Sequence, residues 1–221
     1  MTNSSRKAGR PSEETHARQR LIENARQLFT STAYHKVSMR RVAEQAGVNS
    51  ALVHYYFGSK EGLFEAMLRE TLAPMLSKMR TLLDDQSQSN LADLMRTYTE
   101  EMSKVPQLPR LIAQVMQMPA TDRQRQLIEK VMMDISKPMQ DLLFDKLLDS
   151  GVLRPGIDAN LCRVSFISLM VFPFIAPTAM FAVHGIQLTP EFLARLVEHN
   201  IQLMSEGFLT PPTQQGNRRE N

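Results

Sequence analysis

The stretch from Ser38 to Lys60 constrains the fold most, because it predicts two short helices joined by a tight turn. Ser38 is a favourable N-cap for the first helix, and Gly47 can adopt the left-handed conformation that ends it. Apolar residues recur at helical spacing between them: Val42, Ala43 and Ala46. Asn49 can cap the second helix. Such a helix-turn-helix places its second helix in the major groove of DNA, although an ordinary corner between two helices has the same pattern.

The second helix favours the DNA-binding interpretation, because no acidic residue lies between Asn49 and Lys60. A solvated surface helix normally mixes charges of both signs. Small residues, hydroxyls and ring nitrogens suit base edges and phosphates. The candidate base-reading residues are Ser50, Ala51, Leu52, His54 and Tyr55, behind the cap Asn49. The candidate phosphate contacts are Arg40, Tyr56 and Lys60, with Arg41 as a weaker candidate.

Two segments carry a family resemblance. Ala46-Gly47-Val48 precedes a Tyr-Tyr-Phe-Gly-Ser-Lys-Glu sequence at residues 55–61, and further matching residues lie upstream, at Ala25, Leu28, Phe29, Tyr34, Ser38 and Met39. Over about residues 12–65 the chain resembles the DNA-binding domain of the tetracycline-repressor (TetR) family of bacterial transcriptional regulators. Ala33 departs from that pattern, which usually has Gly there, and a different turn is therefore expected. The resemblance implies a homodimeric repressor, or in some members an activator, whose C-terminal domain binds a small effector.

Charge is distributed unevenly along the chain. Residues 1–60 hold 10 Lys and Arg against 4 Asp and Glu, whereas residues 61–221 hold 16 against 19. Positive charge concentrated at one end is typical of a module that binds a polyanion, although a membrane-surface patch has a similar charge. The polar, basic N-terminus contains no apolar signal sequence, and the single Cys162 excludes an internal disulfide, so a cytoplasmic location is expected.

The periodicity predicts an all-α chain with no strands. We expect a disordered basic arm at residues 1–11, a three-helix DNA-binding domain at 12–60, a helical effector-binding and dimerisation domain at 61–209, and a disordered tail at 210–221. Pro74 should kink or divide the helix that begins at Lys60. Further helices are expected at about 91–104, 108–118, 122–150 (interrupted by Pro138), 158–183 and 189–206, the last stopped by Gly207.

An apolar run from Val164 to Val183 contains no charged residue and is long enough to cross a bilayer. It also contains Pro173 and Pro177, and it follows a charged, amphipathic part of the chain. A helix buried on most faces has the same composition. In the family that the chain resembles, the last two long helices form the dimer interface, and we therefore expect a dimerisation helix and no membrane contact.

No residue pattern indicates an enzyme, a metal site or a cofactor. The chain has no CxxC or HExxH pattern, no glycine-rich phosphate loop and no ordered Ser, His and Asp set. The expected function is a homodimeric regulator that binds a palindromic operator in double-stranded DNA and is released by a small, apolar effector. The alternative is an architectural or nucleoid-associated DNA-binding protein without an effector. The sequence predicts no individual effector-binding residue.

Overall fold

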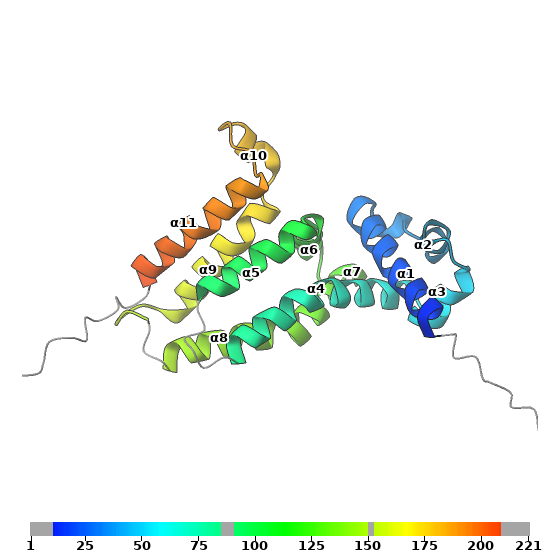
Figure 1. Cartoon of the computed structure of the whole chain (residues 1–221), viewed down its shortest axis with the longest axis horizontal. Helices are drawn as coiled ribbons and strands as arrows, with labels where there is room; N and C mark the ends of the chain where they lie inside the picture. The colour runs from blue at the N-terminus through cyan, green and yellow to red at the C-terminus, as the bar shows by residue number, and fades with distance from the viewer. Residues whose placement is uncertain (1–10, 85–90, 150–152, 209–221) are drawn as a thin grey trace, which may run out of the picture. The chain divides into compact units, whose positions relative to one another are not determined.

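The computed structural model describes residues 11–84, 91–149 and 153–208, and these are helical apart from turns and one isolated bridge at Leu153. The expected basic arm, except Pro11, and the expected C-terminal tail lie outside the described residues. Figure 1 shows the helices. Their bounds are α1 Pro11–Ser31, η1 Tyr34–Lys36, α2 Met39–Ala46, α3 Ser50–Phe57, α4 Lys60–Asp84, α5 Leu91–Lys104, α6 Gln107–Met116, α7 Arg123–Val131, η2 Met132–Ser136, α8 Lys137–Asp149, α9 Ala159–Ile175, α10 Thr178–Ala182 and α11 Pro190–Phe208.

The first compact unit contains the chain up to Ala73 together with Met118–Val131. Its core is apolar and comes from α1, α2, α3 and α4: Leu21, Ala25, Leu28, Phe29, Val42, Val53, Leu63, Phe64 and Met67. The rings of Phe29 and Phe64 meet edge to face with their centroids 4.9 Å apart. The unit thus includes the first half of α4 and all of α7, beyond the domain boundary expected at residue 60.

Helix α4 belongs to both units, because the boundary between them falls between Ala73 and Pro74. Pro74 has no backbone N–H to complete the hydrogen bond to the preceding turn, so it weakens the helix at this point. The helix is nevertheless assigned as one element from Lys60 to Asp84. The expected division at this proline coincides with the limit of the first unit.

The second unit contains Pro74–Gln117 and the chain from Met132 onward. Helix α9 packs against α5, α6, α8 and α11, and α5 also packs against α11. Aromatic pairs tie these helices together: Tyr98 with Phe174 at 5.7 Å, and Phe144 with Phe166 at 6.1 Å. Cys162 is buried in this unit, and burial raises the pKa of its thiol. It therefore packs as a small apolar residue, as the sequence indicates.

Two sequence expectations for the second unit need correction, and one irregularity was not predicted. The expected helix 158–183 ends at Ile175, and a separate short helix α10 follows, because Pro177 disfavours helical backbone at Ala176, which is extended at φ −63° and ψ 141°. Gly207 does not stop the last helix, which continues to Phe208. Before Pro138 the chain forms the π-helical turn η2, a local irregularity that the spacing does not predict.

No helix among the described residues combines the length and the apolarity that a membrane span requires. Helix α9, which contains most of the apolar run, is 17 residues long.

Candidate nucleic-acid interface

The turn between α2 and α3 is built by local hydrogen bonds that the sequence predicts. Ser38 Oγ accepts a hydrogen bond from the backbone N–H of Arg41 at 3.1 Å, and Asn49 Oδ1 accepts one from Ala51 at 2.8 Å. Gly47 ends α2 in the left-handed conformation, with φ 65°. These caps satisfy helix-terminal groups without help from the rest of the chain, so the predicted two-helix arrangement is confirmed.

Helix α3 presents one face to solvent. The exposed residues Ser50, Ala51, His54 and Tyr55 follow the spacing of a single helical face, and Tyr55 is 78% exposed. Val53 on the opposite side is fully buried against the core. The outward face therefore carries a hydroxyl, a methyl group, an imidazole and a phenol, and no carboxylate.

Leu52 and Tyr56 are half-buried at the margins of this face. The Tyr55 and Tyr56 rings meet nearly perpendicularly, with centroids 5.2 Å apart, so the two phenols support one another at the C-terminal end of α3. His54 Nδ1 lies 3.3 Å from the carbonyl oxygen of Gly58, which orients the imidazole along the helix. The aromatic residues are therefore held in place before any ligand binds.

The connection from α3 to α4 depends on a glycine, Gly62, that the sequence pattern does not single out. A Cβ atom at Gly62 would overlap the backbone carbonyl oxygen of Phe57, so only glycine allows the first turn of α4 to approach the end of α3 this closely. Ser59 Oγ accepts a hydrogen bond from the N–H of Gly62 at 3.1 Å and caps α4. The spacing of Phe57 and Gly62 gives no indication of this contact.

Lys60 is half-buried, with its Nζ 4.2 Å from the centre of the Tyr34 ring. Burial lowers the pKa of Lys60, because the ammonium group has lost part of its hydration. Burial likewise raises the pKa of Tyr34 to about 12. Tyr34 thus orients the lysine at the N-terminus of α4 through a cation–π contact that the sequence reasoning missed, since 26 positions separate the two residues.

Arg40 and Arg41 lie exposed in the first turn of α2, where positive charge opposes the helix dipole. Arg40 Nε donates a hydrogen bond to Glu44 at 2.8 Å, and both side chains are mostly exposed. A solvent-exposed ion pair of this kind contributes little to stability. Arg40 can therefore leave Glu44 for another anion at small cost.

A second ion pair joins α1 to α4 next to Phe57, the last residue of α3. Arg18 Nη1 donates to Glu70 Oε2 at 2.9 Å, and Arg18 also bonds the other carboxylate oxygen, so α1 is clamped to α4. The hydrogen bond to Glu70 raises the pKa of Arg18. The guanidinium also lies 5.4 Å from the centre of the Phe57 ring. This contact was not predicted, because it joins residues far apart in the sequence.

Ala33 explains how the chain tolerates the missing glycine. Its backbone has φ −54° and ψ 136°, which any residue adopts, and the 3-10 turn η1 follows directly. The expectation of a different turn after the first helix fits this conformation.

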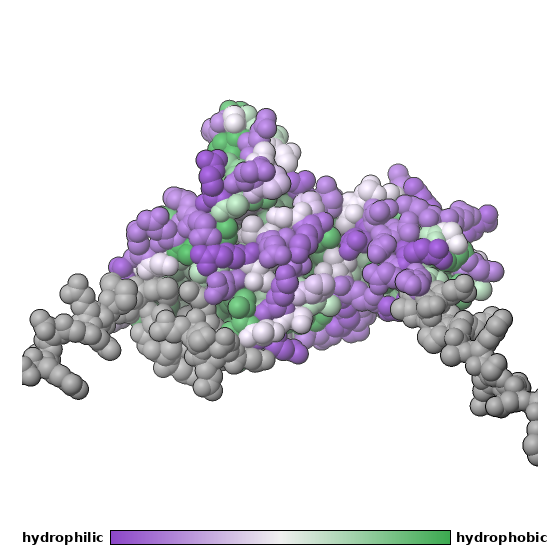
Figure 2. Space-filling model, viewed as in Figure 1, coloured by the Kyte–Doolittle hydropathy of each residue, from purple (hydrophilic) through white to green (hydrophobic). Residues whose placement is uncertain are grey.

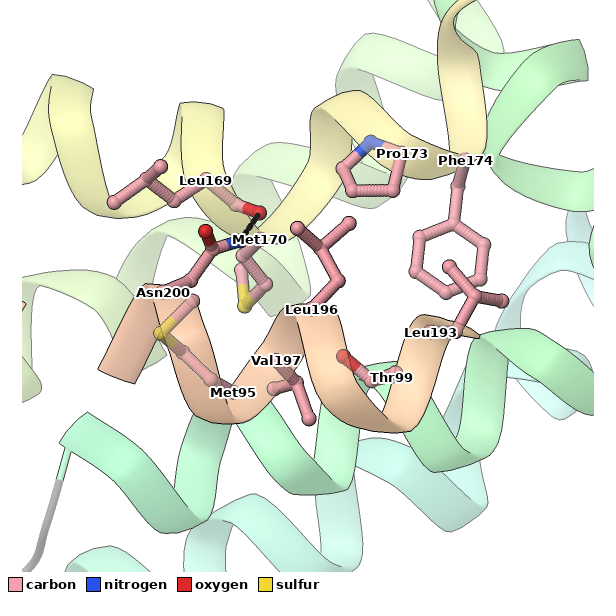
Figure 3. Close-up of a pocket in the computed structure, with 10 residues that line it drawn as sticks. All are labelled: Met95, Thr99, Leu169, Met170, Pro173, Phe174, Leu193, Leu196, Val197 and Asn200. Atoms are coloured by element: carbon pink, nitrogen blue, oxygen red, sulfur yellow. Dashed lines mark hydrogen bonds between the residues drawn. The ribbon is translucent and has the colours of Figure 1, made fainter. Parts of the chain in front are cut away.

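A small cavity in the second unit is the other candidate site (Figure 3). Its volume is about 10 Å³, close to that of a single water molecule. Its lining comes from α5, α9 and α11: Met95, Thr99, Leu169, Met170, Pro173, Phe174, Leu193, Leu196, Val197 and Asn200. The buried amide of Asn200 donates to the Leu169 carbonyl oxygen at 3.1 Å. The lining is mostly apolar and carries no charged side chain.

Comparisons with known proteins agree with this geometry. Residues 21–67 match the family described as bacterial regulatory proteins, tetR family. The chain is 32% identical over 87 residues to the HTH-type transcriptional repressor AcnR of Corynebacterium glutamicum, but that match spans only 43% of the relative's length. It is 27% identical over 192 residues to the HTH-type transcriptional regulator RutR of Escherichia coli K12, covering 85% of this chain and 88% of the relative.

The whole fold also resembles solved structures. The fatty acid degradation regulator FadR of Bacillus halodurans superposes with a TM-score of 0.66 at 17% identity, over 86% of this chain and 98% of that one. The ketosteroid transcriptional regulator KstR2 of Mycobacterium tuberculosis superposes with a TM-score of 0.63 at 18% identity, over 88% and 95%. At these identities the likeness concerns the fold alone.

Proposed function

We propose that this chain, which belongs to the tetR family of bacterial regulatory proteins, is a homodimeric transcriptional repressor that binds a palindromic DNA operator. The observation that carries the proposal is the outward face of α3. It is free of carboxylates, leaves Tyr55 78% exposed, and follows the capped turn of a helix-turn-helix. Such a face fits the edges of base pairs in a major groove.

Base reading is assigned to Ser50, Ala51, His54 and Tyr55, which share the exposed face, and to Leu52 at its margin. The small N-terminal residues let the helix approach the bases, and the methyl group of Ala51 suits a thymine methyl. The hydroxyls and the imidazole of His54 supply hydrogen bonds. Asn49 caps the helix and thereby fixes its entry angle.

Phosphate binding is assigned to Arg40, Arg41, Tyr56 and Lys60. The two arginines oppose the dipole of α2 unless an anion lies against them, and a phosphate would remove that cost. Lys60 stands at the first residue of α4, where the helix N-terminus also favours an anion. Its contact with Tyr34 holds the ammonium group in place before DNA arrives.

A second copy of the chain would cover the exposed apolar stripe of α9. The stripe consists of the apolar residues Leu161, Val164, Phe172 and Ile175 with Ser168 between them, all at helical spacing. Apolar residues on one helical face are left exposed in the single chain, and pairing about a two-fold axis would bury this face against its own copy. Two-fold symmetry in turn requires two related half-sites in the operator.

The effector is proposed to enter the second unit at the cavity between α5, α9 and α11. At about 10 Å³ the cavity is far smaller than the roughly 300–1,000 Å³ of ligand sites, so binding requires movement of its walls. Met95 and Met170 are flexible and can adapt. An effector that favours the altered walls would weaken DNA binding, and bound DNA would weaken effector binding by the same factor.

The small volume of the cavity also supports a second candidate, an architectural DNA-binding protein that has no effector and keeps a filled core. The two candidates differ in one observable property. A repressor releases its operator when a small molecule binds, whereas an architectural protein stays bound to many sites whatever ligand is added. A release screen on a selected operator separates them.

The test of DNA binding is selection from random duplexes with the purified full chain. We expect enrichment of a palindrome with half-sites about one helical turn apart or a multiple of it. Ala51→Asp should abolish enrichment while the helix still folds, because an acid in the first turn favours the helix dipole but repels DNA. Gln107→Asp, an exposed first-turn position of α6, is the matched control and should bind normally. Failure of the unaltered protein to enrich any sequence would overturn the proposal.

A further inference from the structure

The segment between α9 and α11 forms a small projection, here called the α10 arm and comprising residues 176–188. Within the second unit it extends beyond the ends of α9 and α11, as the ribbon in Figure 1 shows. Ala176 at its base is buried, and Arg110 Nε donates to the carbonyl oxygen of Phe174 just before it, at 3.1 Å. The root of the arm is therefore fixed to the bundle.

The arm has ordered backbone hydrogen bonds of its own. The N–H of Val183 donates to Ala179, and that of Ile186 donates to the carbonyl oxygen of Phe181 at 2.9 Å. Gly185 takes φ 68° to make this return possible. A segment held by its own turns adopts a defined shape, and it presents the same side chains to its surroundings each time.

The arm exposes apolar side chains next to the polar residues Thr178, His184 and Gln187. Val183 is 81% exposed and Met180 is 50% exposed, and Figure 2 shows hydrophobic residues on this projection beside hydrophilic ones. Single exposed apolar residues are normal on protein surfaces, but a cluster on a projecting arm indicates a surface that another molecule covers.

The arm is continuous with the α9 stripe. Phe172, a stripe residue, packs its ring against Phe181 of the arm with centroids 6.0 Å apart. Ile175, the last stripe residue, directly precedes the arm. The same molecule that covers the stripe would therefore reach the arm.

Charge favours a second copy of the chain over a different protein. From Val164 to Pro190 the sequence contains no Asp, Glu, Lys or Arg. The absence of charge favours pairing with a second copy, because any charged residue near the two-fold axis would face the same charge on the other copy. A surface that selects an unlike partner normally uses complementary charges.

We infer that the α10 arm clasps the partner subunit, so that Met180 and Val183 of each copy are buried on the other copy and extend the α9 interface. The inference rests on the proposed homodimer. It adds that the arm supplies a distinct share of the dimer affinity, beyond that of the α9 stripe.

The test compares dimer dissociation by sedimentation across a dilution series. The double variant Met180→Glu/Val183→Glu should raise the dimer dissociation constant at least about tenfold, because two charges per copy would be desolvated in the interface. Gln187→Glu adds charge at an exposed polar position of the same arm and is the matched control. Val183→Leu keeps the apolar surface. Both should leave the dissociation constant within about twofold.

A photo-crosslinking amino acid at position 183 locates the contact. We expect a covalent dimer, with adduct peptides from α9 or α10 of the other copy. An unchanged dissociation constant in the double variant, or adducts confined to the same copy, would overturn the inference while leaving the repressor proposal intact. Adducts with added anionic lipid vesicles in place of protein would overturn it in favour of a membrane surface. Unaltered protein that stays monomeric and binds no DNA would instead overturn the proposed function itself.

Discussion

Helix α3 in the first unit and helix α9 in the second both expose bulky side chains, but their surroundings differ. Tyr55 and His54 on α3 end in polar groups, and the cations Arg40, Arg41 and Lys60 belong to the same unit. Apart from Ser168, the side chains of the exposed α9 stripe end in methyl and phenyl groups, and Arg163 is the last charged residue before Glu191. Exposure alone therefore does not identify a partner. The charge and the polar tips around the exposed residues separate a surface suited to a polyanion from one suited to an apolar copy of itself.

The largest effect is expected from a charge placed in the α9 stripe, which would test whether this surface meets a second copy. Val164→Glu should fold normally, because Val164 is already exposed in the single chain. In the proposed dimer the carboxylate would be buried twice, once from each copy, which costs about 3 kcal/mol or more. We expect the dimer to dissociate and operator affinity to fall at least a hundredfold, measured by sedimentation and by DNA titration. Gln114→Glu, exposed on α6, should change neither measurement.

A smaller effect is expected from a change within the first unit, where α3 meets α4. Gly62→Ala forces a methyl group onto the Phe57 carbonyl oxygen, so α3 and α4 must separate. Overpacking of this kind costs about 1–3 kcal/mol. We expect a lower thermal midpoint for the first unit and weaker binding to every DNA sequence, with the dimer unchanged. Gly207→Ala is the control, because a Cβ there meets nothing within 4 Å and Ala favours the helix. A normal midpoint in Gly62→Ala would contradict the close approach.

Tyr55 tests whether the exposed face of α3 reads bases, because it is the exposed aromatic residue assigned to them. Tyr55→Ala should lose about 1–3 kcal/mol of preference at one base-pair position in each half-site. Binding to nonspecific DNA and its salt dependence should stay nearly unchanged. Selection from random duplexes with both proteins measures the change, and Tyr55→Phe shows whether the hydroxyl or the ring is responsible. An identical selected site in Tyr55→Ala would remove this residue from the base-reading set.

The sequence predicts the parts of the site that depend on local hydrogen bonds. Ser38, Gly47 and Asn49 act within a few residues of their partners, so the two helices and their turn follow from the order of residues. The acid-free outward face of α3 likewise follows from spacing. Fold class was predictable for the same reason, since amphipathic periodicity recurs through most of the chain.

The supporting contacts were not predictable, because they join distant parts of the sequence. Arg18 meets Glu70 across 52 positions, and the contact of Lys60 with Tyr34 joins α4 to η1. The break at Pro177 was hidden by an apolar run that looks continuous, although Pro disfavours helical backbone at the residue before it. Gly207 was misread because a helix tolerates one glycine near its end at a cost of about 1 kcal/mol.

The smallest expected effect tests whether the cation at Lys60 meets phosphate. Lys60→Ala should weaken specific and nonspecific binding alike, by roughly 1 kcal/mol, and should reduce the log–log salt slope by about 0.9 for each lost phosphate contact. Because burial lowers the pKa of Lys60, affinity should also decline in unaltered protein as alkaline pH removes its proton, and Lys60→Arg should shift that decline upward. Arg80→Ala removes an exposed cation of the second unit and is the control for net charge. If Lys60→Ala kept the full salt slope, the lysine would serve only to pack on Tyr34, and the phosphate-facing surface would reduce to Arg40, Arg41 and Tyr56.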